Sequence, residues 1–156
     1  MVINKQKYRK FVGRSILTGF LGGLFFIGFS YLFYMFNFIE ISPKSYLIHS
    51  WTSSLWTNSW QGEIITLVLG AIISIFVAYM YVLLFKKILS LWLSIIFGSI
   101  LWGVVTFIWP ILFNNIPTAQ GLDVNTIVSS LSLFILYGTF ISYSISFDYK
   151  QINSLD

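Results

Sequence analysis

The side chains in this sequence that could do chemistry together are three acids and one histidine. Glu40, Glu63 and Asp123 each lie beside a long apolar stretch, and His49 lies between the first two. Carboxylates and an imidazole can hold a metal ion or transfer protons, so the four could form a metal site or an acid–base pair. His49, however, has no second ligand at the HxxxH or ExxH spacing by which one helix holds a metal.

Each acid also has a structural interpretation, which we favour. Asp123 stands where the N-cap of a following helix belongs. Glu63 falls in a first helical turn, where the helix dipole stabilises a negative charge, and Glu40 can pair with Lys44 nearby in the chain. We therefore assign no catalytic, cofactor-binding or metal residue, and keep an outer-face site of Glu40, His49, Glu63 and Asp123 as the alternative.

The composition places these residues in a membrane protein. Of 156 residues, 57% are hydrophobic and 9% are charged, with a mean hydropathy of +0.84. A soluble domain carries about 25% charged residues, so this chain could not cover a water-exposed surface. The absence of cysteine excludes disulfides and thiolate chemistry. We expect no cofactor and no nucleic acid, because no nucleic-acid-binding fold accompanies the net charge of +4.

Four apolar stretches are long enough to cross a bilayer. A helix of about 20 residues spans a hydrocarbon core of about 30 Å. Backbone groups must be paired in lipid, so such stretches must be helical. The sequence predicts an all-α, integral membrane four-helix bundle, one domain over residues 1–156, with spans at about 16–39, 64–85, 88–113 and 126–147.

The basic residues give the bundle a direction. Five precede the first span, Lys86 and Lys87 connect the second and third, and Lys150 follows the fourth, whereas Lys44 lies in the first loop. If the spans alternate, eight of the nine basic residues share one side. The positive-inside rule makes that side cytoplasmic and puts both termini there.

The connections differ in length and character. The short turn at Lys86 and Lys87 predicts that the second and third spans form an antiparallel hairpin. In the first outer loop, Ser42 and Pro43 form a helix start, with Ser42 as the N-cap. The Trp-rich stretch that follows predicts one or two short helices at the outer headgroup level, which anchor the chain or cover a cavity or partner site.

Small residues recur at helical spacing in every span and predict close helix packing. The packing could serve this chain's own helices, which we favour, or a contact with a second copy or another membrane protein. Ser99 and Gly103 form one such pair in the third span. The principal helix-packing residues are Gly19, Gly23, Gly70, Ser74, Gly98, Gly138 and Ser142.

The middles of the spans carry no obvious ionisable residue, which argues against a proton-coupled transporter and an intramembrane hydrolase. The many hydroxyls of the fourth span could line a pore, or could make interhelical hydrogen bonds. Pro110 should kink or end the third span, because it lacks a backbone N–H.

Asp148 is unfavourably placed for its own helix, because the dipole at a helix C-terminus disfavours an anion. We therefore expect it to form an ion pair with Arg14, or with Lys86 and Lys87, at the inner end of the bundle.

Several segments together resemble a known family. These are FNFIEISP (36–43), LDVNT (122–126) and YGTFISYSISFDY (137–149), with GGLF (22–25) in the first span. They are similar to the YqhR family of small membrane proteins from Bacillus-type bacteria. The resemblance extends over nearly the whole chain. It implies a location in the bacterial cytoplasmic membrane, and no functional residues.

Three functions compete on this evidence. We favour a non-enzymatic membrane subunit or scaffold, in contact with the bilayer and with a membrane protein partner or another copy of itself. The alternatives are a small channel or transporter with a hydroxyl-lined path, and an outer-face enzyme acting on lipid or cell-wall precursor.

Overall fold

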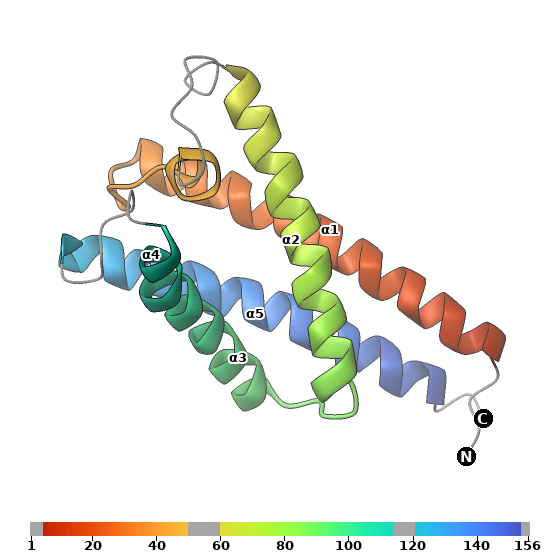
Figure 1. Cartoon of the computed structure of the whole chain (residues 1–156). Coiled ribbons are helices and arrows are strands. Elements are labelled where there is room, and N and C mark those ends of the chain that lie inside the picture. The colour runs from red at the N-terminus through yellow and green to blue at the C-terminus, as the bar shows by residue number, and fades with distance from the viewer. Residues whose placement is uncertain (1–4, 50–59, 114–120, 154–156) are drawn as a thin grey trace.

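The computed structural model describes residues 5–49, 60–113 and 121–153, and these are entirely helical or irregular (Figure 1). They contain no strand. The elements are α1 (Lys5–Met35), the π-helical turn η1 (Ser45–His49), α2 (Trp60–Phe85), α3 (Leu91–Gly103), the π-helical turn η3 (Val104–Ile108), α4 (Trp109–Leu112) and α5 (Val124–Asn153).

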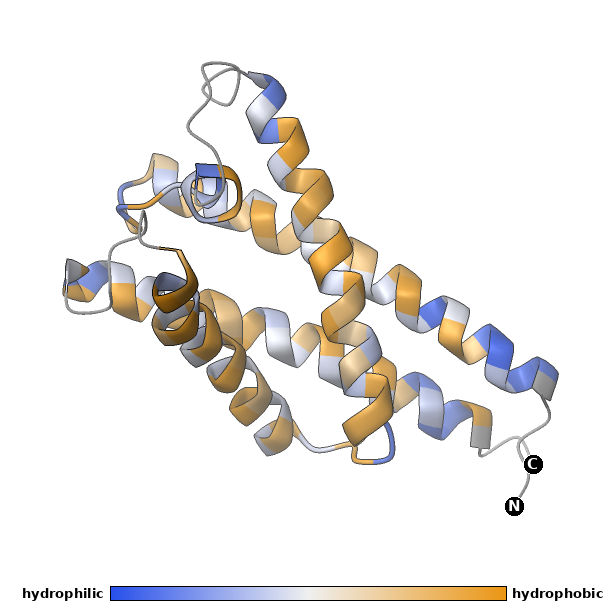
Figure 2. Cartoon of the chain, in the orientation of Figure 1, coloured by the Kyte–Doolittle hydropathy of each residue, from blue (hydrophilic) through white to orange (hydrophobic). Residues whose placement is uncertain are grey.

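Within the described residues, four helical stretches are long and apolar enough to cross a membrane, as the sequence predicted. They are Gln6–Met35, Trp60–Phe85, Leu91–Leu112 and Val124–Ile152. The third combines α3, η3 and α4. Figure 2 shows apolar residues along the middles of these helices and hydrophilic ones gathered at the ends of α1 and α5 near the chain termini. The all-α fold class is therefore confirmed.

The first helix ends four residues before the predicted boundary at Ile39, because Asn37 turns the chain. Asn37 has a φ of 58°. Its N–H donates to the Tyr34 carbonyl at 3.1 Å, and the Phe38 N–H donates to the Phe33 carbonyl at 2.8 Å. The Phe33 and Phe38 rings pack with centroids 5.6 Å apart. This is a Schellman motif with its hydrophobic contact, and Asn is one of the few residues that tolerate the left-handed position.

The third spanning helix also begins later than predicted, at Leu91 rather than Ile88. Ser90 precedes it in an extended conformation, with φ −144° and ψ 129°. The Ser90 carbonyl accepts the first hydrogen bond, from the Ser94 N–H at 3.2 Å. The connection from α2 therefore includes Ile88, which the apolar pattern assigned to the span.

Pro110 neither breaks the third span nor ends it at once. The chain widens into the π-helical turn η3 over the residues just before it, and α4 continues to Leu112. A proline ring clashes with the carbonyl four residues earlier in a regular α-helix. A π-helical turn changes that register, so the helix completes a further turn before it ends at the extended Phe113.

The helices pack in the spatial order α2, α1, α5, α3. The largest interfaces are α1 with α2 and α3 with α5, and α1 with α5 joins these two pairs. Figure 1 shows α1 and α5 running side by side in opposite directions, with both chain ends at one end of the molecule. Within the described residues, the two helices of the predicted antiparallel hairpin, α2 and α3, pack mainly against α1 and α5. They meet at the Tyr81 and Phe97 rings, whose centroids are 5.0 Å apart. The small residues of α1 and α2 face each other, and those of α3 and α5 face each other.

Glycines lie where the helices cross. A Cβ built on Gly19 would lie 2.8 Å from the Ala78 Cβ, and one on Gly23 would lie 2.6 Å from the Ser74 Cβ. In the other pair, a Cβ on Gly98 would lie 2.5 Å from the Phe134 carbonyl oxygen. Gly138 faces Gly98 directly. Backbone approach this close is what small residues permit in membrane bundles.

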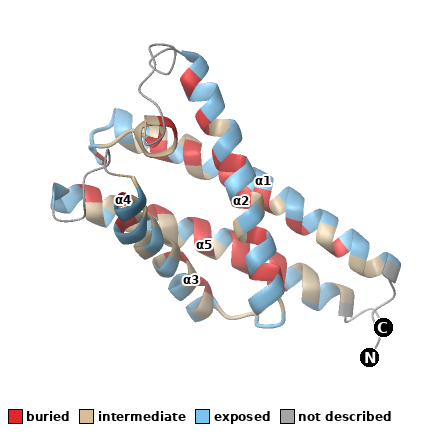
Figure 3. Ribbon diagram, viewed as in Figure 1, coloured by how far each residue is buried: buried red, intermediate tan, exposed pale blue. Residues whose placement is uncertain are grey.

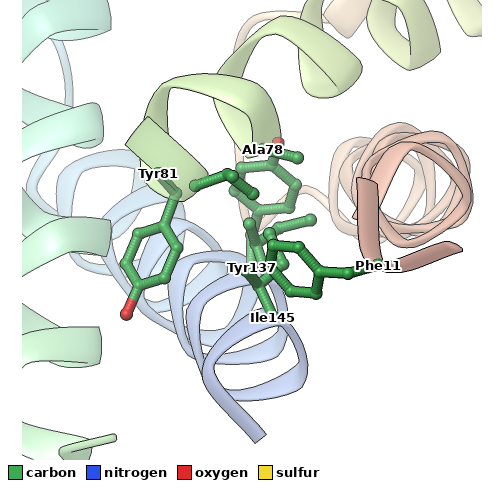
Figure 4. Close-up of a cluster of buried hydrophobic side chains, with 7 residues drawn as sticks. Phe11, Ala78, Tyr81, Tyr137 and Ile145 are labelled. Atoms are coloured by element: carbon green, nitrogen blue, oxygen red, sulfur yellow. The ribbon is translucent and has the colours of Figure 1, made fainter. Parts of the chain in front are cut away.

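The buried core lies where α1, α2 and α5 meet, toward the end that holds the chain termini (Figures 3 and 4). The Ser74 hydroxyl donates to the Gly19 carbonyl at 2.6 Å and lies 2.6 Å from the Tyr137 hydroxyl. Ser74 has one hydroxyl proton, so Tyr137 donates to Ser74. This network connects three helices. The core residues are Phe11, Ala78, Tyr81, Val82, Tyr137, Ile141 and Ile145.

We predict that Gly98→Ala destabilises the fold by about 1–3 kcal/mol, because its new methyl group would meet the α5 backbone. Gly103→Ala is the matched control on the same helix, because no atom lies within 4 Å of its built Cβ. It should change stability by about 0.5 kcal/mol or less. Equilibrium unfolding in mixed detergent micelles measures both. Equal effects of the two substitutions would contradict the α3–α5 crossing.

Candidate functional site

Two of the four residues in the predicted outer site lie close together. The Asp123 backbone N–H donates to Glu40 Oε2 at 3.4 Å, and the Glu40 backbone N–H donates to Thr126 Oγ1 at 3.0 Å. The segment after α1 is thereby fastened to the start of α5. In both contacts a backbone N–H of one residue donates to a side-chain oxygen of the other.

Asp123 itself caps α5. Its Oδ2 accepts a hydrogen bond from the Asn125 N–H at 3.3 Å, and its carbonyl accepts one from the Ile127 N–H at 3.1 Å. The first bond satisfies a donor that the first helical turn leaves free, and the second is the first regular hydrogen bond of the helix. The carboxylate therefore has a complete structural role at the N-cap position.

Glu63 and His49 lie on other elements. Glu63 is in the first turn of α2, and His49 is the last residue of η1. Among the residues that the structure describes, no three His, Asp or Glu side chains gather as a metal site would require. The outer residues thus form one backbone-linked pair, Glu40 with Asp123, and two separate groups.

At the end of the bundle away from the start of α1, the segment 39–49 with η1 forms a small roof. Ser42 Oγ accepts a hydrogen bond from the Ser45 N–H at 3.3 Å, the capping contact expected from Ser42 and Pro43. The Trp109 Nε1–H donates to the Tyr46 carbonyl at 3.2 Å and fastens η1 to α4. Burial raises the pKa of the Tyr46 phenol. Trp51 and Trp56 of the predicted interfacial stretch lie outside the described residues.

The opposite end holds a group of charged and aromatic side chains. Arg14 Nη1 lies 3.6 Å from Asp148 Oδ1, with the Arg14 side chain 61% exposed and that of Asp148 24% exposed. Lys86 does not face Asp148. Its Nζ lies 5.0 Å from the Tyr8 ring centroid and 5.7 Å from that of Tyr149, within cation–π range. Nζ also donates to the Tyr8 hydroxyl at 3.4 Å.

A cavity of about 520 Å³ lies inside the bundle. Its walls come from residues 23–30 of α1, 70–84 of α2, 97–109 of α3, η3 and α4, and 122–137 of the α5 region, and residues 39–47 form the roof. Nearly all of the lining is apolar. Pockets between helices that are mostly apolar and have a few polar groups are typical binding sites.

Several serine hydroxyls of α5 form hydrogen bonds within the protein. Ser130 donates to the Ile127 carbonyl at 3.1 Å and accepts from Trp102 Nε1 at 3.0 Å. Ser132 and Ser142 donate to carbonyls of their own helix. Ser146 lies 3.0 Å from the Tyr81 hydroxyl. Ser130 and Ser146 thus take part in hydrogen bonds between helices, whereas Ser132 and Ser142 bond within α5.

Comparison with known proteins decides the family. The family model described as "Conserved membrane protein YqhR" matches residues 3–156. The chain belongs to the YqhR family. It is 36% identical over 142 residues to the Bacillus subtilis (strain 168) protein called "Uncharacterized protein YqhR", and the match covers 91% of this chain and 79% of the relative. No solved structure matches.

Two features of this YqhR-family chain were missed by the sequence reasoning. Tyr8 and Tyr149 lie 141 positions apart, so only the fold brings both beside Lys86. The hydrophobic pattern of the sequence does not reveal the cavity, because the residues that line it are apolar, like those of a packed core.

We predict that Asp123→Ala weakens the start of α5 by about 0.5–2 kcal/mol, through loss of the N-cap. Asp123→Asn should keep most of that stability, because an amide oxygen can accept the same Asn125 hydrogen bond. Amide hydrogen exchange of the first turn of α5 measures the effect. Faster exchange in the alanine variant alone is expected, and equal protection in both would contradict the capping role.

Proposed function

We propose that this chain is a small non-enzymatic integral membrane protein that serves as a subunit or scaffold in a membrane complex. We further propose that it lies in the bacterial cytoplasmic membrane with both termini cytoplasmic. The family is described as a membrane protein, and the chain carries four helices able to span a bilayer. The finer assignment rests on one unused helix face and on the charge distribution.

The observation that carries the scaffold proposal is the free face of α3. Only Ser94 and Gly98 of this helix are buried, and they face α5. Ser99 and Gly103 lie about 140° further round the helix at 100° per residue, and no atom lies within 4 Å of a Cβ built on Gly103. Gly103 of the second small-residue pair is therefore left with open space beside it.

Large apolar residues flank that pair at helical spacing. Trp92 is 78% exposed, Ile96 51% and Phe107 55%. A small pair between bulky neighbours is the pattern by which membrane helices approach each other closely. We therefore assign the contact with a second membrane helix, from a partner or another copy, to this face of α3.

Photo-crosslinking tests the scaffold proposal. A photoreactive amino acid at Ile96 or Phe107 should give one stoichiometric protein product in native membranes, whereas the same residue at Phe25 on α1, which is 60% exposed, should not. Gly103→Ile should reduce the product about five- to thirtyfold, if close approach contributes about 1–2 kcal/mol. A clean monomer from both α3 positions would reject the proposal.

Gly28→Ile on α1 is the matched control for that substitution. It introduces the same side chain at a glycine that also has no atom within 4 Å of its built Cβ. The crosslinked product should survive in this variant. Loss of the product in both variants would point to a general folding defect and would contradict a specific role for the α3 face.

The orientation follows from the positive-inside rule and is tested by cysteine labelling, for which the cysteine-free chain is suited. In intact spheroplasts, a membrane-impermeant maleimide should label Gln61→Cys and Asn125→Cys. It should label Gln6→Cys and Gln151→Cys only after lysis. The reverse pattern would overturn the proposed topology.

A further inference from the structure

The internal cavity has a lining that does not suit water. The hydroxyls of Ser30, Ser74 and Ser130 already donate to backbone carbonyls at 2.7, 2.6 and 3.1 Å. A buried water needs two to four polar partners, and an apolar cavity without them stays dry. A volume of about 520 Å³ is also within the range of small-molecule pockets. An apolar occupant therefore fits this space better than solvent.

The cavity opens sideways between α2 and α3. These helices contribute facing walls, and their backbones approach each other at few positions within the described residues. The Tyr81 and Phe97 rings join them toward the Lys86–Lys87 connection, with centroids 5.0 Å apart. On the α2 side, Phe76 is 62% exposed and Leu84 is 63% exposed, although both line the cavity. At the outer end the roof residue Tyr46 is fastened to Trp109. The side opening faces the bilayer if the four helices span it.

The two ends of the opening differ in charge. Leu84 lines the cavity just before the connection that carries Lys86 and Lys87. Lys86 is engaged by Tyr8 and Tyr149, whereas Lys87 is exposed. A lysine at the membrane surface attracts an anionic headgroup. The mouth of the cavity on the Lys87 side is thus suited to an anionic amphiphile.

We propose that this cavity holds an acyl chain of an anionic phospholipid from the leaflet on the Lys86–Lys87 side, with the headgroup beside Lys87. A partner helix is a poorer occupant. A helix about 10 Å wide fills about 420 Å³ per turn, so the cavity holds little more than one turn. A flexible hydrocarbon chain can follow the space lengthwise. The proposal does not depend on the scaffold role, because the free face of α3 lies away from the cavity.

The test uses the full chain in nanodiscs of phosphatidylcholine with a small fraction of phosphatidylglycerol that carries a diazirine in its acyl chain. Photolabel should concentrate in peptides from 73–84 and 97–105. Val105→Trp and Met80→Trp, which fill the cavity from opposite walls, should each reduce the label several-fold. Ile72→Trp is the control, because Ile72 is 56% exposed on α2 and does not line the cavity.

The headgroup is tested separately. With matched diazirine lipids, labelling by phosphatidylglycerol should exceed labelling by phosphatidylcholine. Lys87→Gln should reduce that preference by up to about fivefold, as expected for one lysine at a membrane surface. Lys150→Gln removes an exposed lysine at the end of α5 and should leave the preference unchanged. Equal labelling by the two lipids would overturn the anionic assignment.

Three further results would overturn the inference. One is uniform label over all exposed apolar surfaces, insensitive to both cavity-filling variants. Another is a photoreactive residue at Val105 that captures a protein helix rather than lipid. The third is the loss of all bound phosphatidylglycerol from the parent protein in native mass spectrometry. Gly103→Ile should leave lipid labelling intact, so failure of the scaffold proposal and failure of this one are distinguishable.

Discussion

The hydrogen bonds at Ser74 depend on the close approach of α1 and α2, and much of the bundle depends on them in turn. Gly19 and Gly23 carry no side chain, so α2 can approach until the Ser74 hydroxyl reaches the Gly19 carbonyl at 2.6 Å. Tyr137 of α5 then donates to the same hydroxyl. In an apolar bundle there is little hydrophobic drive to bring helices together, so packing and buried hydrogen bonds carry the specificity.

The close packing of α1 against α2 also explains why the bundle is open on one side. The small residues of α2 are used against α1, and Ser94 and Gly98 of α3 are used against α5. The short connection makes α2 and α3 neighbours in the chain, and they meet at the Tyr81 and Phe97 rings, but most of their packing is against other helices. The apolar cavity is the space that remains between two helices with other partners.

The two ends of the molecule are organised by different forces. At the end where α5 begins, backbone N–H groups bonded to the Glu40 carboxylate and the Thr126 hydroxyl join the segment after α1 to α5, and the Trp109–Tyr46 bond holds η1 in place. At the other end, Lys86 lies over two tyrosine rings and Arg14 lies near Asp148. Ionisable groups thus stay at the ends, where water is within reach, and the membrane-spanning middles are held by hydroxyls and close packing.

The sequence by itself determined that this is an all-helical membrane protein with four apolar spans, because lipid permits only internally bonded backbone over such lengths. It also indicated the caps at Ser42 and Asp123, since capping is a local contact. It did not indicate where α1 ends, because the apolar run continues through the turn that Asn37 makes. Helix pairing, the open side beside α2 and the aromatic contacts of Lys86 were decided only in the tertiary structure. These features depend on which faces meet across the chain, and every face of a membrane helix is similarly apolar.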